Sequence, residues 1–253
     1  MKILLGGALG RMGREVTAAA AEAQVEIVCG VDVAYTGQPS DYPIVTAFDQ
    51  ATQKADVLID FSRPSALPEL LQLVRKEKMP AVLCTTGYNE AELQMIEEAS
   101  REIPVFRSAN MSLGVNVLRH LVQEAARALG EDFDVEIVER HHRMKADSPS
   151  GTALMLYDSV KEATETLRQP VFGRYGRTAQ RQPGEVGIHA VRGGTIAGEH
   201  EVCFYGDGEE LILTHRAEKR SLFARGALRA AAFLMDKPAG KYDMQDLIEE
   251  MLR

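Results

Sequence analysis

The sequence lacks a long apolar run, a block of basic residues and a pair of closely spaced cysteines. No stretch reaches the length needed to cross a bilayer, and the N-terminus, which enters the apolar run Lys2–Leu5 at once, has none of the features of a signal peptide. The formal net charge of the 253 residues is -8, so nucleic acid and anionic membranes are poor partners. These absences predict a cytoplasmic globular protein.

The three cysteines, Cys29, Cys84 and Cys203, each lie in an apolar, strand-like stretch far from the other two. This distribution indicates reduced core residues in a cytosolic protein, and nothing beside them supports the alternative of a catalytic thiol. The sequence contains no Cys-x-x-Cys pair and no other ligand set typical of zinc. We therefore expect no metal.

Residues 1–112 alternate between short apolar runs and helical patterns. The expected strands are 2–5, 26–31, 57–61, 81–84 and 105–106, and the expected helices are about 11–23, 64–78 and 90–101. Asn89 and Glu92 form a capping box for the last of these helices. The alternation indicates the α/β class, with a Rossmann-type doubly wound parallel sheet. We expect residues 218–253, helical from 221 to 235 and again from 243, to complete this dinucleotide-binding domain.

Residues 113–217 follow a different pattern. A helix over 113–129, a strand over 135–139 and a helix that ends near Leu167 precede a loop over 169–187. Strand patterns follow over 188–192, 195–205 and 209–214, joined by two glycine pairs, Gly193-Gly194 and Gly206-Asp207-Gly208, which are typical of hairpins. The segment predicts a second α+β domain with a mixed, mainly antiparallel sheet.

A glycine-rich segment, Gly7-Ala8-Leu9-Gly10-Arg11-Met12-Gly13, follows the first expected strand. Glycines at a strand-to-helix turn expose backbone N–H groups to a dinucleotide pyrophosphate, next to the positive end of a helix. Asp32 ends the second strand, where an acid accepts hydrogen bonds from the adenine ribose. Val33 and Ala34 come next instead of Arg, which favours NADH, although Arg11 leaves NADPH open. The alternative is a tight turn with an incidental acid.

Two further turns follow expected strands and carry small polar groups: Cys84-Thr85-Thr86-Gly87 and Ser108-Ala109-Asn110-Met111. Ligands bind at the carboxyl ends of strands in open α/β sheets. Hydroxyl and amide groups at these ends suit a nicotinamide carboxamide. Ordinary turn chemistry explains the same residues equally well.

A basic loop within residues 139–152 concentrates charge in an otherwise acidic chain. Two of the six histidines, His141 and His142, adjoin there, with Arg140, Arg143 and Lys145 beside them. Such a cluster would be costly in a packed core but would bind a dianion and deliver a proton. Residues 148–152 then lead into a helix whose N–H groups suit a carboxylate. A solvated charged loop is the competing interpretation, and a metal site is a weaker one.

Seven segments together resemble the dihydrodipicolinate reductase family over essentially the whole chain. They are GALGRMGR (7–14), DFSRP (60–64), TTG (85–87), SANMSLGVNV (108–117), ERHHRMKADSPSGTAL (139–154), GEHEV (198–202) and Asp243-Met244. The spacing of the basic loop segment is highly specific to that family. The resemblance implies reduction of 4-hydroxy-tetrahydrodipicolinate, after loss of water, to tetrahydrodipicolinate with NADH or NADPH in lysine and diaminopimelate biosynthesis.

The resemblance also implies roles for individual residues. His141 and Lys145 correspond to the catalytic proton-transfer groups, and His142, Gly151 and Thr152 to the binding groups for the substrate carboxylates. The implied cofactor contacts are Gly7, Ala8, Leu9, Gly10, Arg11, Met12, Asp32, Cys84, Thr85, Thr86, Ser108, Ala109, Asn110, Met111 and Arg220. The family further implies a homotetramer built by the domain 113–217, which also binds the substrate.

Two other functions share some of these features. Another two-domain dehydrogenase, acting on an amino acid or keto acid, would have the glycine loop and Asp32 but would not require His141, His142 and Lys145 together. A non-catalytic NADH sensor would bind the cofactor without turnover. A substrate panel separates the two enzymes.

Overall fold

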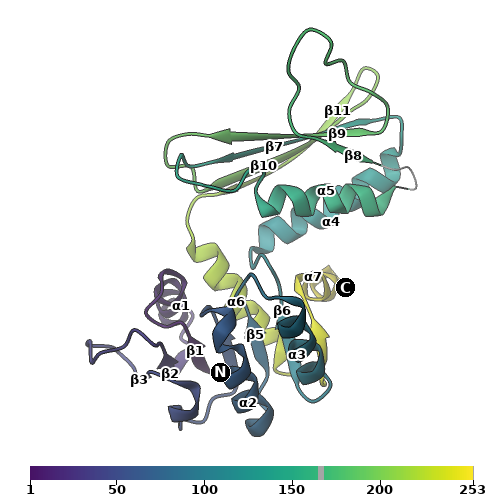
Figure 1. The fold of residues 1–253 in the computed structure, drawn as a ribbon. Coiled ribbons are helices and arrows are strands. Elements are labelled where there is room, and N and C mark those ends of the chain that lie inside the picture. The colour runs from purple at the N-terminus through teal and green to yellow at the C-terminus, as the bar shows by residue number, and fades with distance from the viewer. Residues whose placement is uncertain (165–167, 253) are drawn as a thin grey trace. The chain divides into compact units, whose positions relative to one another are not determined.

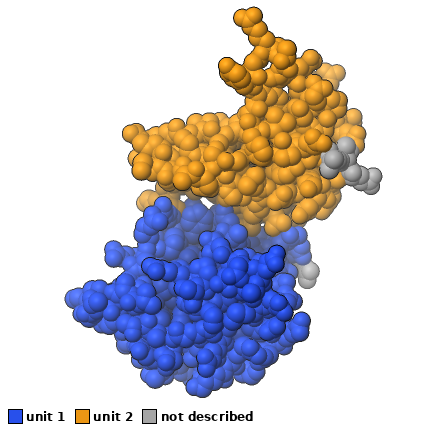
Figure 2. All heavy atoms as spheres, viewed as in Figure 1, with its two compact units in different colours: residues 1–113, 220–253 blue, residues 114–219 orange. Residues whose placement is uncertain are grey.

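The computed structural model describes residues 1–164 and 168–252, and the chain divides into two compact units (Figures 1 and 2). Unit 1 comprises residues 1–113 and 220–253, and unit 2 comprises residues 114–219. The sequence places the same divisions at 112/113 and 217/218. Assigning cofactor binding to the first domain, and substrate binding and oligomerisation to the second, stays a prediction.

Unit 1 contains a seven-stranded sheet in which every pairing is parallel. Its strands are β1 (Lys2–Gly6), β2 (Glu26–Val31), β3 (Ile44–Val45), β4 (Val57–Asp60), β5 (Ala81–Leu83), β6 (Pro104–Arg107) and β12 (Gly240–Tyr242), in the order β12-β6-β5-β4-β1-β2-β3. The chain runs outward from β1 to β3 and then returns to the other side of β1. Ligands bind at such a reversal, beyond the carboxyl ends of the strands.

Helices cover both faces of this sheet, as a doubly wound fold requires (Figure 1). One face packs against α1 (Arg11–Glu22), α6 (Ser221–Leu234) and α7 (Met244–Leu252). The other packs against α2 (Leu67–Glu77) and α3 (Glu90–Ser100), with short 3-10 turns at Phe48–Gln50 and Pro64–Ala66. The predicted capping box of α3 is present, because Asn89 and Glu92 each accept a hydrogen bond from the other's backbone N–H. The predicted fold class of this unit is confirmed.

The C-terminal segment packs back on unit 1, as the sequence predicts. Strand β12 pairs in parallel with β6 and adds an edge strand that the sequence does not reveal. Short strands of two or three residues, such as β3 and β12, have too few positions to show a period of two.

Unit 2 is a five-stranded mixed sheet with two long helices on one face (Figure 1). The helices are α4 (Leu113–Leu129) and α5 (Gly151–Ala163), and the strands are β7 (Asp134–His141), β8 (Gln169–Val171), β9 (Glu185–Arg192), β10 (Gly198–Tyr205) and β11 (Glu210–Ala217). The order β11-β10-β7-β9-β8 contains two antiparallel and two parallel pairings. The sheet is mixed, as predicted, but its parallel share is larger than the hairpin signals indicate.

One of the two predicted hairpins is wrong. Gly206-Asp207-Gly208 joins the antiparallel neighbours β10 and β11, but Gly193-Gly194 joins β9 and β10, which are separated by β7. The backbone N–H of His142 reaches the carbonyl of Ile196, so the end of β7 fills the space between the two strands. The expected loop over 169–187 also contains β8, and the expected end of the preceding helix at Leu167 lies outside the described residues.

Candidate active site

The glycine loop forms the turn between β1 and α1. Gly7 has φ +73°, and a Cβ there would lie 2.6 Å from the carbonyl oxygen of Phe61, so only glycine fits. A Cβ on Gly13 would lie 2.2 Å from the carbonyl oxygen of Gly7, which explains the close approach of α1 to the loop. Gly10 caps α1 without a side-chain hydrogen bond. The N–H groups of the first helical turn therefore suit a pyrophosphate.

Asp32 lies where β2 ends and contacts the glycine loop directly. One carboxylate oxygen accepts a hydrogen bond from the N–H of Leu9 at 2.9 Å, and the other accepts one from Ala34 at 2.9 Å. These bonds fix the carboxylate beside the loop, where a ribose could also donate to it. The loop and Asp32, predicted from spacing alone, thus lie together.

The two polar turns follow β5 and β6, whose carboxyl ends lie at the same edge of the sheet as those of β1 and β2. Thr85 Oγ1 donates to a carboxylate oxygen of the buried Asp60 at 2.7 Å. A Cβ on Gly6 would lie 2.4 Å from the other oxygen of Asp60, so this carboxylate links the β1 end to the β5 turn. Burial raises the pKa of Asp60, and hydrogen bonds from Ser62 and Thr85 oppose that rise.

The remaining predicted cofactor residues also belong to unit 1. Ser108 Oγ donates to the carbonyl of Asn110 at 2.9 Å, which closes the turn after β6. Cys84 is buried. Burial, and to a smaller extent the negative charge of Asp60, raises the pKa of its thiol. The side chain therefore suits packing and not nucleophilic chemistry. Arg220 is exposed at the N-cap of α6.

The basic loop begins at the end of β7, in unit 2. Alternate residues of β7 point to the helix-covered face of the sheet, and these are Val135, Ile137, Glu139 and His141. The buried end of that row is therefore polar. His141 is 8% exposed, and its Nδ1 lies 2.6 Å from a carboxylate oxygen of Glu139.

Glu139 is fully buried and has several donors. Both terminal nitrogens of Arg192, on β9, donate to it at 2.7 Å, and the N–H of Ser150 donates at 3.0 Å. We call Glu139, His141, Ser150 and Arg192 the Glu139 cluster. Burial acts to raise the pKa of Glu139, but the hydrogen bonds from Arg192, His141 and Ser150 outweigh it and lower the pKa. The carboxylate is therefore ionised at neutral pH.

Burial lowers the pKa of His141, and the hydrogen bond and charge of Glu139 only partly oppose this. Its ring lies edge-on to that of His200, with centroids 5.1 Å apart. His200 Nε2 lies 2.8 Å from Ser150 Oγ, and burial lowers the pKa of His200 to about 4. Two largely neutral imidazoles therefore adjoin the buried carboxylate.

Lys145 lies in the loop after β7, with its side chain 20% exposed. Its Nζ donates to both carboxylate oxygens of Asp147 at 2.8 Å, and this hydrogen bond is the main cause of the lowered pKa of Asp147. The N–H of Lys145 bonds the carbonyl of His142, which forms a tight turn. The loop thus presents an ammonium group near His141 and His200, and its positive charge contributes to the lowered pKa of both.

The loop ends at the N-terminus of α5, where Gly151 and Thr152 are located. Ser150 caps this helix, and its Oγ accepts from the N–H of Ala153 at 3.1 Å. The exposed Gly151 and the half-buried Thr152 lie in the first helical turn, where N–H groups attract an anion. The structure thus brings His141, Lys145 and the α5 N-terminus to one end of unit 2.

Sequence reasoning missed Glu139 and Arg192 as members of the site. A signal for Glu139 was available, since an acid at an inward position of an alternating strand is seldom solvated. Arg192 had none, because its contact with Glu139 spans 53 residues and depends on the parallel pairing of β7 with β9.

A second glutamate of β7 has a similar set of partners on the open face of the sheet. Glu136 lies 2.6 Å from His189 Nε2 and 2.8 Å from Arg174, and it also pairs with Arg181. We call these four residues the Glu136 cluster. Its glutamate and histidine are more exposed than Glu139 and His141, with 17% of the Glu136 side chain and 33% of the His189 side chain accessible.

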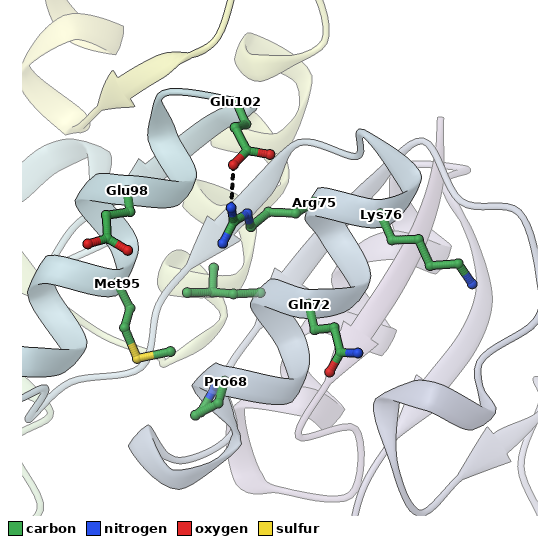
Figure 3. Close-up of a pocket in the computed structure, with 8 residues that line it drawn as sticks. Pro68, Gln72, Arg75, Lys76, Met95, Glu98 and Glu102 are labelled. Atoms are coloured by element: carbon green, nitrogen blue, oxygen red, sulfur yellow. Dashed lines mark hydrogen bonds and ion pairs between the residues drawn. The ribbon is translucent and has the colours of Figure 1, made fainter.

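A groove on unit 1 is lined by none of these residues (Figure 3). It runs between α2 and α3, and the ion pair of Arg75 with Glu102 crosses it, near Met95 and Gln72. The groove holds none of the residues that the sequence predicts for cofactor or substrate binding. Among the described residues, no three or more His, Cys, Asp or Glu side chains lie close enough together to hold a metal ion. No helix in this part of the chain is long and apolar enough to span a membrane.

Comparisons with known proteins agree with this architecture. Residues 1–111 match the family model "Dihydrodipicolinate reductase, N-terminus", and residues 114–248 match "Dihydrodipicolinate reductase, C-terminus". The chain is 49% identical to a 4-hydroxy-tetrahydrodipicolinate reductase of Caldanaerobacter subterraneus subsp. tengcongensis over 99% of both chains. It is 45% identical to one of Clostridium tetani over 98% of this chain and 97% of that protein.

A solved structure shares the fold. It is a dipicolinate-bound dihydrodipicolinate reductase from Paenisporosarcina sp. TG-14, with a TM-score of 0.78 at 22% identity, covering 96% of this chain and 97% of that one. The family matches cover both units, and the predicted resemblance is confirmed. The chain therefore belongs to the dihydrodipicolinate reductase family.

Proposed function

We propose that this protein reduces 4-hydroxy-tetrahydrodipicolinate, after loss of water, to tetrahydrodipicolinate with a nicotinamide cofactor, as a step of lysine and diaminopimelate biosynthesis. The observation that carries the proposal is the clustering of His141, Lys145 and the α5 N-terminus around a buried carboxylate in a member of this family. The Caldanaerobacter and Clostridium tetani relatives are each named 4-hydroxy-tetrahydrodipicolinate reductase.

The cofactor residues are the glycine loop, Asp32, the two polar turns and Arg220. The turn at Gly7, which a Cβ would fill, and the helix start at Gly10, which no side chain caps, fit the pyrophosphate. We infer a preference for NADH, because the Asp32 carboxylate would repel a 2′-phosphate and the exposed Val33 offers no charge to hold one. When bound, the nicotinamide supplies the hydride.

The substrate is a dicarboxylate, a class supported by the dipicolinate in the Paenisporosarcina relative. We assign one carboxylate to His142 and the N–H groups of Gly151 and Thr152, where the α5 dipole favours an anion. The substrate must compete with Asp147 for the ammonium of Lys145, since both Asp147 oxygens now contact it. Lys145 or protonated His141 then stabilises negative charge on the ring-nitrogen side and supplies a proton.

We further propose a cytoplasmic homotetramer without a metal. The three buried, unpaired cysteines fit a reducing compartment. The open face of the unit 2 sheet carries partly exposed apolar side chains, Val191, Tyr205 and Ile212, which suit contact with another copy. Light scattering on the purified chain tests the assembly, and a monomer at micromolar concentration would contradict it.

The test is a coupled assay. The purified protein is mixed with the freshly made condensation product of pyruvate and aspartate semialdehyde, and the oxidation of NADH and NADPH is followed in parallel. Rapid oxidation that depends on the condensation product supports the reductase, and a higher kcat/KM with NADH supports the inference from Asp32. Binding of NADH without turnover would favour the sensor, and oxidation with a keto acid instead would favour another dehydrogenase.

A further inference from the structure

The Glu139 carboxylate determines which nitrogen of His141 carries a proton. A carboxylate that is ionised can only accept hydrogen bonds, so His141 Nδ1, at 2.6 Å, must be the donor. The remaining nitrogen, Nε2, is then free to accept or release the exchangeable proton. A Cβ on Gly198 would lie 3.1 Å from Nε2, so the glycine keeps this side of the ring open.

Arg192 connects the same carboxylate to the loop that carries Lys145. Its guanidinium donates to both oxygens of Glu139, and Nη2 also donates to the carbonyl of Asp147 at 2.7 Å. The next residue, Gly193, donates its N–H to the carbonyl of His141 at 2.9 Å. Arg192 thus holds the end of β7, which precedes Lys145, through Glu139, and it holds the backbone that follows Lys145 through Asp147.

We propose that Glu139 and Arg192 form a positioning pair, in which Glu139 fixes the tautomer and orientation of His141 and Arg192 fixes the loop of Lys145. Neither residue touches the reacting atoms in this proposal, which rests on the proposed roles of His141 and Lys145. Orienting partners of this kind hold catalytic imidazoles in other enzymes, where their loss costs activity more than binding.

The charges around His141 give the pair a signature that a purely structural ion pair would not have. The groups that face its ring are Glu139, Arg192, Lys145 and His200. Among them Glu139 raises the pKa of His141, whereas Arg192 lowers it. Removing one member or the other should therefore move the titration of His141 in opposite directions.

The experiment uses the full chain labelled with ¹³C at histidine Cε1, with the His141 resonance assigned by its loss in His141→Asn. Glu139→Gln should shift the titration of His141 to lower pH, and Arg192→Gln should shift it to higher pH. Each variant should lower kcat roughly a hundredfold with little change in the KM for NADH. The limb of the pH–rate profile that belongs to His141 should move in the same direction as its titration.

The matched control is Glu136→Gln, which removes the glutamate charge on the open face of the same strand from a carboxylate that also holds one histidine and two arginines. It should leave the titration of His141 and kcat unchanged. The molar mass of every variant in solution is measured by light scattering, because a change in oligomeric state would alter kcat by another route.

The outcomes separate this inference from the proposed function. If wild-type protein reduces the substrate but neither variant moves the His141 titration, the positioning pair is wrong and the reductase stands. If wild-type protein is inactive yet the two shifts occur in opposite directions, the reductase proposal fails and the electrostatic pairing stands. Arg192→Gln alone decides the case if Glu139→Gln does not fold, since a shift to lower pH would overturn the inference.

Discussion

Strand β7 carries a glutamate on each face of the unit 2 sheet, and the two clusters use the same chemistry in different surroundings. Each glutamate lies 2.6 Å from a histidine nitrogen and pairs with arginine. Glu139 is fully buried, whereas 17% of the Glu136 side chain is exposed. The arginines of the two clusters are part-buried to a similar degree, so the difference lies in the carboxylates. Within one chain, water reaches and screens the Glu136 carboxylate, while the fully buried Glu139 carboxylate imposes its charge and geometry on its neighbours.

The comparison shows that a glutamate, a histidine and arginines do not by themselves mark an active site. The Glu139 cluster adjoins the N-terminus of α5, the second buried imidazole of His200 and a loop with a lysine. The Glu136 cluster instead ties the segment after β8 to the sheet, through Arg174 and Arg181. We therefore expect substitutions in the Glu139 cluster to change catalytic activity and substitutions in the Glu136 cluster to change stability.

The largest effect should come from Lys145→Ala. If the ammonium stabilises developing charge and supplies a proton, kcat should fall roughly 10²- to 10⁴-fold while the Kd for NADH changes by less than about twofold. Steady-state kinetics and NADH fluorescence titration measure the two quantities. Lys161→Ala, near the end of α5, is the control and should leave both unchanged. Equal losses of turnover and NADH binding in Lys145→Ala would contradict the role.

The next effect concerns the free energy of unfolding at acid pH, and it tests how deeply His200, which adjoins the Glu139 cluster, is buried. Burial lowers the pKa of His200 to about 4 in the folded protein, from an ordinary 6.5. The folded state therefore favours the neutral ring, so this contribution is complete above pH 6.5 and is lost as the pH falls towards 4. Its full size is about 3 kcal/mol for a group that is only 4% exposed.

The substitution His200→Gln should remove this pH dependence, even though it also perturbs the contact with Ser150 at every pH. Between pH 6.5 and 4 the free energy of unfolding should fall by about 3 kcal/mol less than in wild type. Urea unfolding of unit 2, followed at several pH values, measures the difference. Parallel curves for the two proteins would show that His200 titrates normally in the folded state.

Two glycines allow the clusters to be perturbed in the same way. A Cβ on Gly198 would lie 3.1 Å from His141 Nε2, and a Cβ on Gly187 would lie 1.8 Å from Glu136 Oε2. Gly198→Ala should press on the imidazole and lower kcat roughly tenfold with a small loss of stability, because a misplaced catalytic group is costly. Gly187→Ala should displace the flexible carboxylate of Glu136, lowering the Tm while kcat stays near wild type. The reverse pattern would mean that the open face serves the chemistry.

The sequence predicted those parts of the molecule that depend on neighbouring residues. The turn at Gly7 and the capping box at Asn89 follow from local geometry, and the structure contains both. Asp32 lies at the end of the second strand, beside the glycine loop, where the spacing places it. The alternation of strands and helices likewise determined the class of unit 1. The catalytic and binding roles themselves stay predictions until activity is measured.

Contacts between distant segments were not predictable in the same way. The glycines at 193–194 have the composition of a hairpin turn, yet β7 lies between the strands that they join, because tertiary pairing overrides a local signal. The pairing of Glu139 with Arg192 depends on that same insertion. The parallel pairing of β7 with β9, which the hairpin prediction missed, is therefore what brings Glu139 and Arg192 together.

The smallest expected effect is that of Arg174→Gln, which completes the comparison with Arg192→Gln. Arg174 is partly exposed and pairs with Glu136 and Glu185, so its loss should cost no more than about 1 kcal/mol of stability. High salt should reduce that cost, because mobile ions already screen an accessible pair. Thermal unfolding at low and high ionic strength measures it, and kcat should match wild type at both. A loss of kcat comparable to that of Arg192→Gln would show that the two faces of β7 are coupled and that burial is not what separates them.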